Sequence, residues 1–180
     1  MDVYRHFSLN YSTGLFHGEN ARVFRLVLKD WRRVDLMPTW CDSDLTLKSD
    51  TSQDIKHFIE FNRKKTPDKI LDAESFLPAP SDVDSKEWMV SKWGTRSNLE
   101  EVVEISGYKE GMEKHQYSFR TIGTPPKGVI RAMSEMFPGI VFILEFYEKV
   151  EGFRGLSKFQ DGVMFHDEMG EYYGRRGGIA

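Results

Sequence analysis

The sequence contains a single cysteine among its 180 residues, and this scarcity excludes several kinds of site. Cys41 cannot form a disulfide within the chain, and no Cys and His residues recur at the spacing of a zinc site. Cys41 also lacks a basic neighbour that would lower the pKa of its thiol, which argues against a nucleophile. We therefore expect a protein of a reducing compartment that uses no metal or other cofactor.

Long apolar runs and familiar catalytic motifs are missing as well. No stretch approaches 18 apolar residues, and the N-terminus MDVYRHFSLN has no apolar core of a signal peptide. No GxGxxG, Walker or GxSxG element occurs. These absences predict a soluble cytoplasmic protein that does not bind membranes, and they disfavour an enzyme.

The charge and composition are those of an ordinary globular protein. The chain has 25 basic and 28 acidic residues, a net charge of −3, and 39% hydrophobic residues. A chain of this length buries about 70% of its unfolded surface, so it can fold without metal or disulfide. The small negative charge argues against strong binding of phosphate groups.

Residues 1–36 form an N-terminal decorating segment whose structure has two interpretations. From Asn20 onward apolar residues recur at spacings of three and four, which favours an amphipathic helix. Phe24, Leu26 and Leu28 also alternate, so a strand stays open. In the helical case a basic stripe lies on the outer side, either as a solvated face or as a patch for an anionic partner. The stripe comprises Arg22, Arg25, Lys29, Arg32 and Arg33.

Beyond this segment the apolar pattern alternates between strand and helix spacing. The expected elements are a strand over 41–48, a helix from Thr51 or Ser52 to Lys65 with a capping box to Asp54, a partly docked insertion at about 66–98 with a helical turn that stops at Gly94, strands over 101–105 and 117–122, a helix after Pro125-Pro126 that ends at Phe137, a strand over 140–147, and two short strands over 152–158 and 163–166.

This order predicts an α+β fold of the ferredoxin-like, split βαβ kind, in which two helices pack on one face of an antiparallel sheet. We assign residues 37–170 to this domain, with a long insertion and an extra C-terminal hairpin. Residues 171–180 are expected to form a flexible tail.

Several short motifs resemble one known family. They are Trp93-Gly94-Thr95, the strand Ser118-Phe119-Arg120-Thr121 that leads into Pro125-Pro126, Phe137-Pro138, the turn Gly152-Phe153-Arg154-Gly155, and a strand with an early cysteine at Trp40-Cys41. Over residues 38–168 the sequence resembles the YubB-like family of phage and plasmid proteins. The resemblance implies a ferredoxin-like fold and an accessory role on a mobile genetic element. It implies no reaction and no catalytic residue.

The histidines and acidic residues give no catalytic or metal site by their spacing. In a strand, only His166 and Glu168 of the sequence His166-Asp167-Glu168 share a face, so a polar strand end is favoured over a metal site. His57 is expected to be a partly buried structural histidine. His6, His17 and His115 have no partner at metal spacing. The acidic clusters Glu100, Glu101, Glu104 and Glu110, Glu113 are expected to form an exposed surface.

One face of the expected sheet is the candidate binding surface. If Phe142, Leu144 and Phe146 face the helices, the open face presents Arg120, Val141, Ile143, Glu145 and Tyr147. One tyrosine beside a glutamate is a poor platform for stacking bases. An apolar strip with the acidic segment 99–113 as its rim suits a protein interface better.

The sequence thus predicts a non-catalytic accessory protein of a phage or plasmid that binds a host or element-encoded protein. The alternative is RNA or DNA binding through the basic N-terminal segment and the open sheet face.

Overall fold

The structure is a computed structural model that describes residues 38–82, 85–105 and 107–174. The chain divides into Met1–Met37 and Pro38–Ala180, and the fold described below belongs to the second unit. The predicted N-terminal helix or strand and its basic stripe lie outside the described residues.

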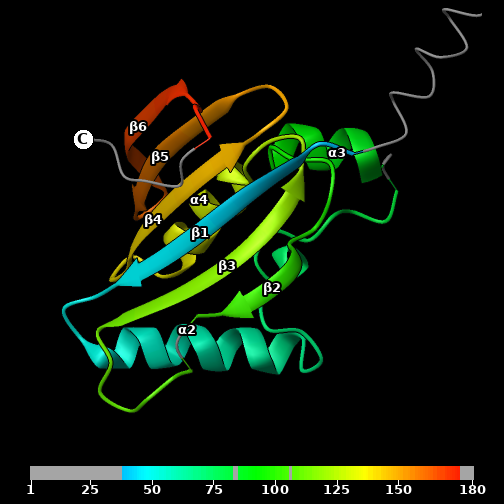
Figure 1. The fold of residues 1–180 in the computed structure, drawn as a ribbon. Helices are drawn as coiled ribbons and strands as arrows, with labels where there is room; N and C mark the ends of the chain where they lie inside the picture. Colours follow the sequence, from blue (N-terminus) through cyan, green and yellow to red (C-terminus); the bar gives the residue numbers. More distant parts are fainter. Residues whose placement is uncertain (1–37, 83–84, 106, 175–180) are drawn as a thin grey trace, which may run out of the picture. The chain divides into compact units, whose positions relative to one another are not determined.

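A six-stranded antiparallel sheet with the strand order β2-β3-β1-β4-β5-β6 forms the centre of this unit (Figure 1). The elements in chain order are β1 (Trp40–Lys48), α2 (Ser52–Lys65), a 3-10 turn η1 (Ala73–Ser75), α3 (Ser85–Lys92), β2 (Glu100–Glu104), β3 (Lys114–Ile122), α4 (Lys127–Met136), β4 (Val141–Glu148), β5 (Phe153–Gln160) and β6 (Val163–Glu171). The expected antiparallel α+β architecture is confirmed.

The alternation of side chains along β1, β3 and β4 explains why these strands occupy the middle of the sheet. On each of them every second residue is buried against the helices. The buried set on β4 is Phe142, Leu144 and Phe146, as the sequence predicts, with exposed fractions of 3% or less.

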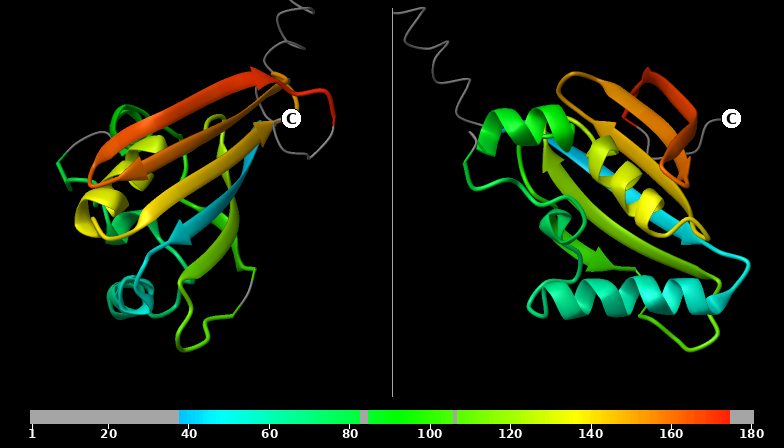
Figure 2. Two further views of the ribbon diagram at one scale, coloured as in Figure 1. Left: turned by 90° about the vertical axis from the view of Figure 1, so that its left-hand side faces the viewer. Right: turned by 180° about the vertical axis from the view of Figure 1, so that it is seen from behind.

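Helices α2 and α4 lie on one face of the sheet (Figure 2). Ile55, Phe58 and Ile59 form the buried stripe of α2, and the Phe58 ring contacts the rings of Phe76, Phe137 and Phe142. Three apolar residues of α4 are buried in the same way: Val129, Ile130 and Met133. Spacings of three and four therefore produce the expected helical faces.

The start of α2 differs from the predicted capping box. Thr51 is the N-cap residue, but its hydroxyl bonds no helix N–H. Instead the hydroxyls of Ser49 and Thr51 donate to the Asp54 carboxylate, at 2.7 and 2.8 Å. These hydrogen bonds lower the pKa of Asp54.

The insertion at 66–98 is docked onto the core, as expected. Leu71 and Phe76 are buried, and Trp93 is 1% exposed with its indole N–H donating to the Leu77 carbonyl at 2.7 Å. Helix α3 ends before Gly94, whose φ of 83° lies in the left-handed region.

A tight backbone contact joins the end of this insertion to α4. The Gly128 N–H donates to the Trp93 carbonyl at 3.1 Å, and a Cβ atom at Gly128 would lie 1.8 Å from the Lys92 carbonyl oxygen. Only glycine allows this approach, because any side chain would push the two backbones apart.

The C-terminal hairpin is longer than expected. Strand β6 ends at Glu171, whereas a short strand over 163–166 was expected. The ring of the next residue, Tyr172, stacks on the Tyr147 ring with 5.1 Å between ring centres. Most side chains of β6 are exposed. The strand therefore lacks the alternation of buried apolar residues from which its length could be predicted.

Candidate interaction surface

The face of the sheet opposite α2 and α4 carries no helix in the part of the chain that the structure describes (Figures 1 and 2). The strand register arranges its side chains in rows that cross the sheet. We call two of them the charged row and the acidic row. The charged row is Arg120, Asp42, Tyr147 and Arg154. The acidic row is Ser118, Asp44, Glu145, Leu156 and Glu168.

All five residues predicted for the open face lie on it. Val141, Ile143, Glu145 and Tyr147 follow one another along β4, and Arg120 lies two strands away, beyond Asp42. Glu145 is exposed and the other four are half-buried. The structure therefore supports their placement, while their role in binding stays a prediction.

Arg120 is held by its neighbours in the charged row. Its guanidinium donates to Glu101 at 3.2 Å and to Asp42 at 3.5 Å, and it lies 5.4 Å from the ring centre of Trp40. Two carboxylates and an aromatic face thus surround the one arginine that the sequence assigned to this surface. An arginine neutralised in this way attracts a phosphate less strongly than a free one.

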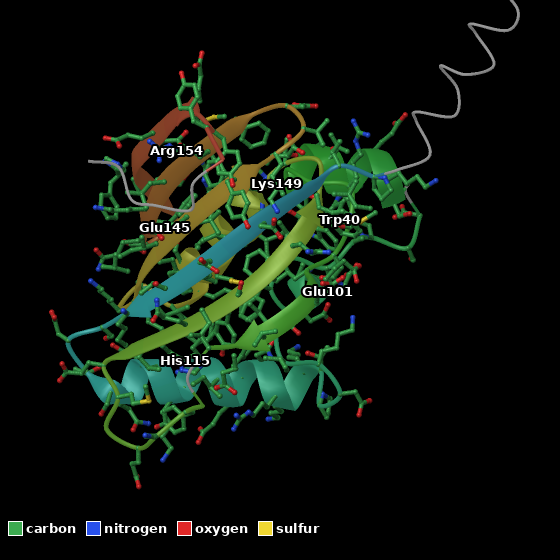
Figure 3. All side chains as sticks on the ribbon, viewed as in Figure 1. Trp40, Glu101, His115, Glu145, Lys149 and Arg154 are labelled. Carbon is green, nitrogen blue, oxygen red and sulfur yellow. The ribbon has the colours of Figure 1, made fainter. Side chains whose placement is uncertain are left out.

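Aromatic and cationic side chains gather at one end of the open face (Figure 3). The Tyr147 and Tyr172 rings stack at 5.1 Å, and Lys149 Nζ lies 5.6 Å from the Tyr147 ring centre. Trp40 lies on the same face at the start of β1. Sequence reasoning missed Trp40, although its even spacing from Asp42 and Asp44 places all three on one face.

The acidic row contains a pair of like charges in direct opposition. Asp44 on β1 and Glu145 on β4 are cross-strand partners near the middle of the sheet. Glu145 makes no hydrogen bond or ion pair with any described residue. Like charges in this arrangement destabilise a sheet by about 0.2–1 kcal/mol. Sequence reasoning missed Asp44, because the pairing depends on the register between two strands that are distant in the chain.

At the outer strand β6 the residues 166–168 alternate as predicted. His166 Nε2 and Glu168 Oε1 lie 3.4 Å apart on the open face. Asp167 points to the helix side, where Lys127 and Ser157 each donate to it at 2.6 Å. Burial opposes ionisation of Asp167, but these hydrogen bonds prevail and lower its pKa.

Two expectations about titratable residues are wrong. His57 is exposed because it lies just outside the buried stripe of α2, and its ring packs edge-on against Phe137 with 5.5 Å between ring centres. Glu104 is not part of an exposed acidic surface, since its strand turns it inward to within 2.9 Å of His115 Nε2. His115 itself is fully buried, a position that its sequence context did not reveal.

The Cys41 thiol is buried and is not activated. Burial raises the pKa of the Cys41 thiol to about 12, so the thiol stays protonated at neutral pH. Among the residues that the structure describes, no three His, Cys, Asp or Glu side chains are grouped to hold a metal ion. No helix in those ranges is long and apolar enough to cross a membrane.

Comparisons with known proteins support the fold. Residues 92–176 match the model of a family described as the ferredoxin-like domain in Api92-like protein, a range that includes β2 through β6. A ferredoxin-like domain is therefore supported. None of the comparisons supports the resemblance to the YubB-like family, although the fold which that resemblance implied is the one found.

One solved structure is similar to the chain: the crystal structure of a protein Api92 from Yersinia pseudotuberculosis, with a TM-score of 0.45 and 16% sequence identity. The match covers 60% of this chain, which in turn spans 41% of that structure. No curated protein matches the sequence.

Proposed function

We propose that the chain is a non-catalytic accessory protein of the cytoplasm, encoded by a phage or plasmid, which binds a protein partner through the open face of its sheet. The partner is a host or element-encoded protein whose contact surface carries lysine or arginine side chains. The strand order supports a split βαβ arrangement as the scaffold, with β3 between β1 and β2 and β1 between β3 and β4.

The single observation that carries this proposal is the opposition of Asp44 and Glu145. A sheet gains no stability from two carboxylates at directly opposed positions. A basic side chain from a partner would give the Glu145 carboxylate a favourable ion pair in place of this repulsion. Charge complementarity of this kind speeds association and selects the correct partner.

Apolar and aromatic side chains beside the acidic row provide the rest of an interface. Val141 and Ile143 precede Glu145 on β4, and Leu156 lies directly opposite Glu145 on β5. Tyr147 and Trp40 lie on the same face. Interfaces concentrate their binding energy in such aromatic residues, surrounded by polar ones.

Nucleic-acid binding is the second candidate. Its basic stripe, Arg22, Arg25, Lys29, Arg32 and Arg33, lies outside the described residues. On the open face the acidic row would repel phosphates, and Arg120 is already paired with Asp42 and Glu101. The geometry of the described residues therefore favours a protein partner.

Affinity capture with matched charge variants tests the proposal. The tagged wild type, Glu145→Lys and the control Glu60→Lys on α2 are exposed to bacterial lysate that has been treated with nuclease. We expect a stoichiometric protein on the wild type and on Glu60→Lys, and its loss from Glu145→Lys. Recovery of nucleic acid from untreated lysate, with partners lost after nuclease, would support the alternative. Equal recovery on all three variants would contradict binding through the open face.

A further inference from the structure

A pocket on the helix side of the sheet is independent of the open face. It has a volume of about 320 Å³ and lies between the last turns of α2, the loop that follows it, and the strands β2 and β3. Its lining comprises Ile59, Arg63, Pro67, Asp68, Lys69, Ile70, Glu104 and Tyr117. This volume is at the lower end of the range of small-molecule sites.

A hydroxyl group at the floor of the pocket has no partner within the described protein. The Tyr117 side chain is 2% exposed, and its hydroxyl makes no hydrogen bond with any described residue. The hydroxyl is not fully buried, so a molecule in the pocket can reach it. Since Tyr117 lines the pocket, a molecule bound there can supply the missing hydrogen bond.

Opposite charges line the pocket without meeting each other. Arg63 makes no ion pair with any described residue, although Glu104 lines the same space. Lys69 is already paired, with Asp72 at 3.0 Å. Within the described part of the chain Arg63 therefore has no carboxylate partner, and Glu104 forms an ion-pair contact with His115 alone.

The His115 ring lies next to the Glu104 carboxylate. Its Nε2 lies 2.9 Å from Glu104 Oε1, and its ring lies edge-on to the Tyr117 ring with 4.7 Å between centres. The imidazole is fully buried, and neither ring nitrogen has a hydrogen bond of good geometry. Burial lowers the pKa of His115 and favours the neutral ring, so the negative charge of Glu104 is not cancelled at neutral pH.

We propose that this pocket binds a small zwitterion of the α-amino-acid class with an apolar side chain. The ligand carboxylate bridges the Arg63 guanidinium and the Tyr117 hydroxyl, both of which are donors. Its ammonium group binds Glu104, with Asp68 at the rim as a second acceptor. Its side chain contacts Ile59, Pro67 and Ile70. One ligand thus pairs with the separated charges and with the Tyr117 hydroxyl together.

An NMR titration of the full chain tests this proposal. The isotopically labelled protein is titrated separately with each of the twenty amino acids. We expect saturable shifts at Tyr117 and Glu104 with one or more apolar amino acids. The N-acetyl and amide derivatives of leucine, which lack one charge each, should bind about tenfold more weakly than leucine or not at all.

Three variants and one control assign the binding to the pocket. Arg63→Gln, Glu104→Gln and Tyr117→Phe should each weaken binding, by about tenfold for the charged groups. Lys64→Gln removes a neighbouring exposed cation outside the lining and should bind like the wild type. Arg63 is exposed, so Arg63→Gln keeps the fold even if Glu104→Gln does not.

Three results would overturn the proposal. The first is the absence of saturable shifts with any amino acid, which would mean that water alone fills the pocket. The second is equal binding of leucine and its N-acetyl derivative. The third is unchanged affinity in Arg63→Gln.

Discussion

The Glu145 carboxylate on the open face is placed where the sheet gains no stability from it. Asp44 and Glu145 oppose each other, and Glu168 continues the acidic row on the outermost strand. A sequence shaped by stability alone would place an uncharged or basic residue at one of these positions. Residues that lower stability in this way are commonly retained for binding.

Glu145→Gln should stabilise the isolated protein by about 0.2–1 kcal/mol, because it removes the repulsion from Asp44. Urea unfolding of the variant measures this change. The control is Glu60→Gln, an exposed substitution on α2, which should change stability by less than about 0.5 kcal/mol. A destabilised Glu145→Gln would show that Glu145 is compensated within the chain, and would contradict the account.

His115 should make stability depend on pH in the mildly acidic range. Because burial lowers its folded-state pKa below the ordinary value of 6.5, the unfolded chain takes up the proton first. Stability should therefore be full above about pH 7.5 and fall as the pH drops through 6.5. Asp54 and Asp167, whose pKa values are lowered from 3.8, lose their contribution only at more acidic pH.

Urea midpoints at several pH values between 7.5 and 5 measure this dependence. A His115→Gln variant should lose most of the slope over this interval, whereas His57→Gln, at an exposed histidine, should keep it. An unchanged slope in His115→Gln would contradict the assignment of the effect to His115.

At the scale of the elements, the sequence predicts best those helices and strands that have one buried face. The alternation in β1 and β4 and the helical spacing in α2 and α4 indicate these elements from sequence, because each has one buried side. Strand β6 is mostly exposed, so its length was underestimated. The partial docking of the insertion at 66–98 was expected from the sequence, but the backbone contact at Gly128 depends on tertiary structure.

Gly128→Ala should destabilise the protein, although alanine is the better helix former by about 1 kcal/mol. The added Cβ would lie 1.8 Å from the Lys92 carbonyl oxygen, so α4 or the end of the insertion must move. We expect a net loss of about 1–3 kcal/mol in urea unfolding. Gly107→Ala, where nothing lies within 4 Å of the new Cβ, should be close to neutral. A stabilised Gly128→Ala would refute the tight contact.

Trp93→Ala should cost about 3–5 kcal/mol, since it removes a buried indole and leaves the Leu77 carbonyl without its donor. Thermal and urea unfolding both measure this loss. Trp88→Ala, at a half-buried position on α3, should cost less. A Trp93→Ala protein that stays stable but loses its partner would instead identify Trp93 as a contact residue.

At the scale of the described unit, the site was predicted in part. The composition of the open face could be inferred, because alternate residues of one strand point to the same side. These residues of β4 are Val141, Ile143, Glu145 and Tyr147. The acidic row could not, since it depends on the register of β1 against β4 and of β5 against β6. The pocket with Glu104 and Tyr117 is formed by α2, β2 and β3. It could not be predicted, because no local sequence pattern indicates that these three elements are in contact.

The central claim, that a partner protein covers the open face, is tested most directly by carboxylate footprinting. The protein, free and bound to its captured partner, is labelled with a carbodiimide and an amine, and each modified residue is quantified by mass spectrometry. The account predicts strong protection of Glu145 in the complex and unchanged labelling of Glu60 and Glu135 on the helices. Equal labelling of Glu145 in both states, with protection on α2 or α4, would contradict it.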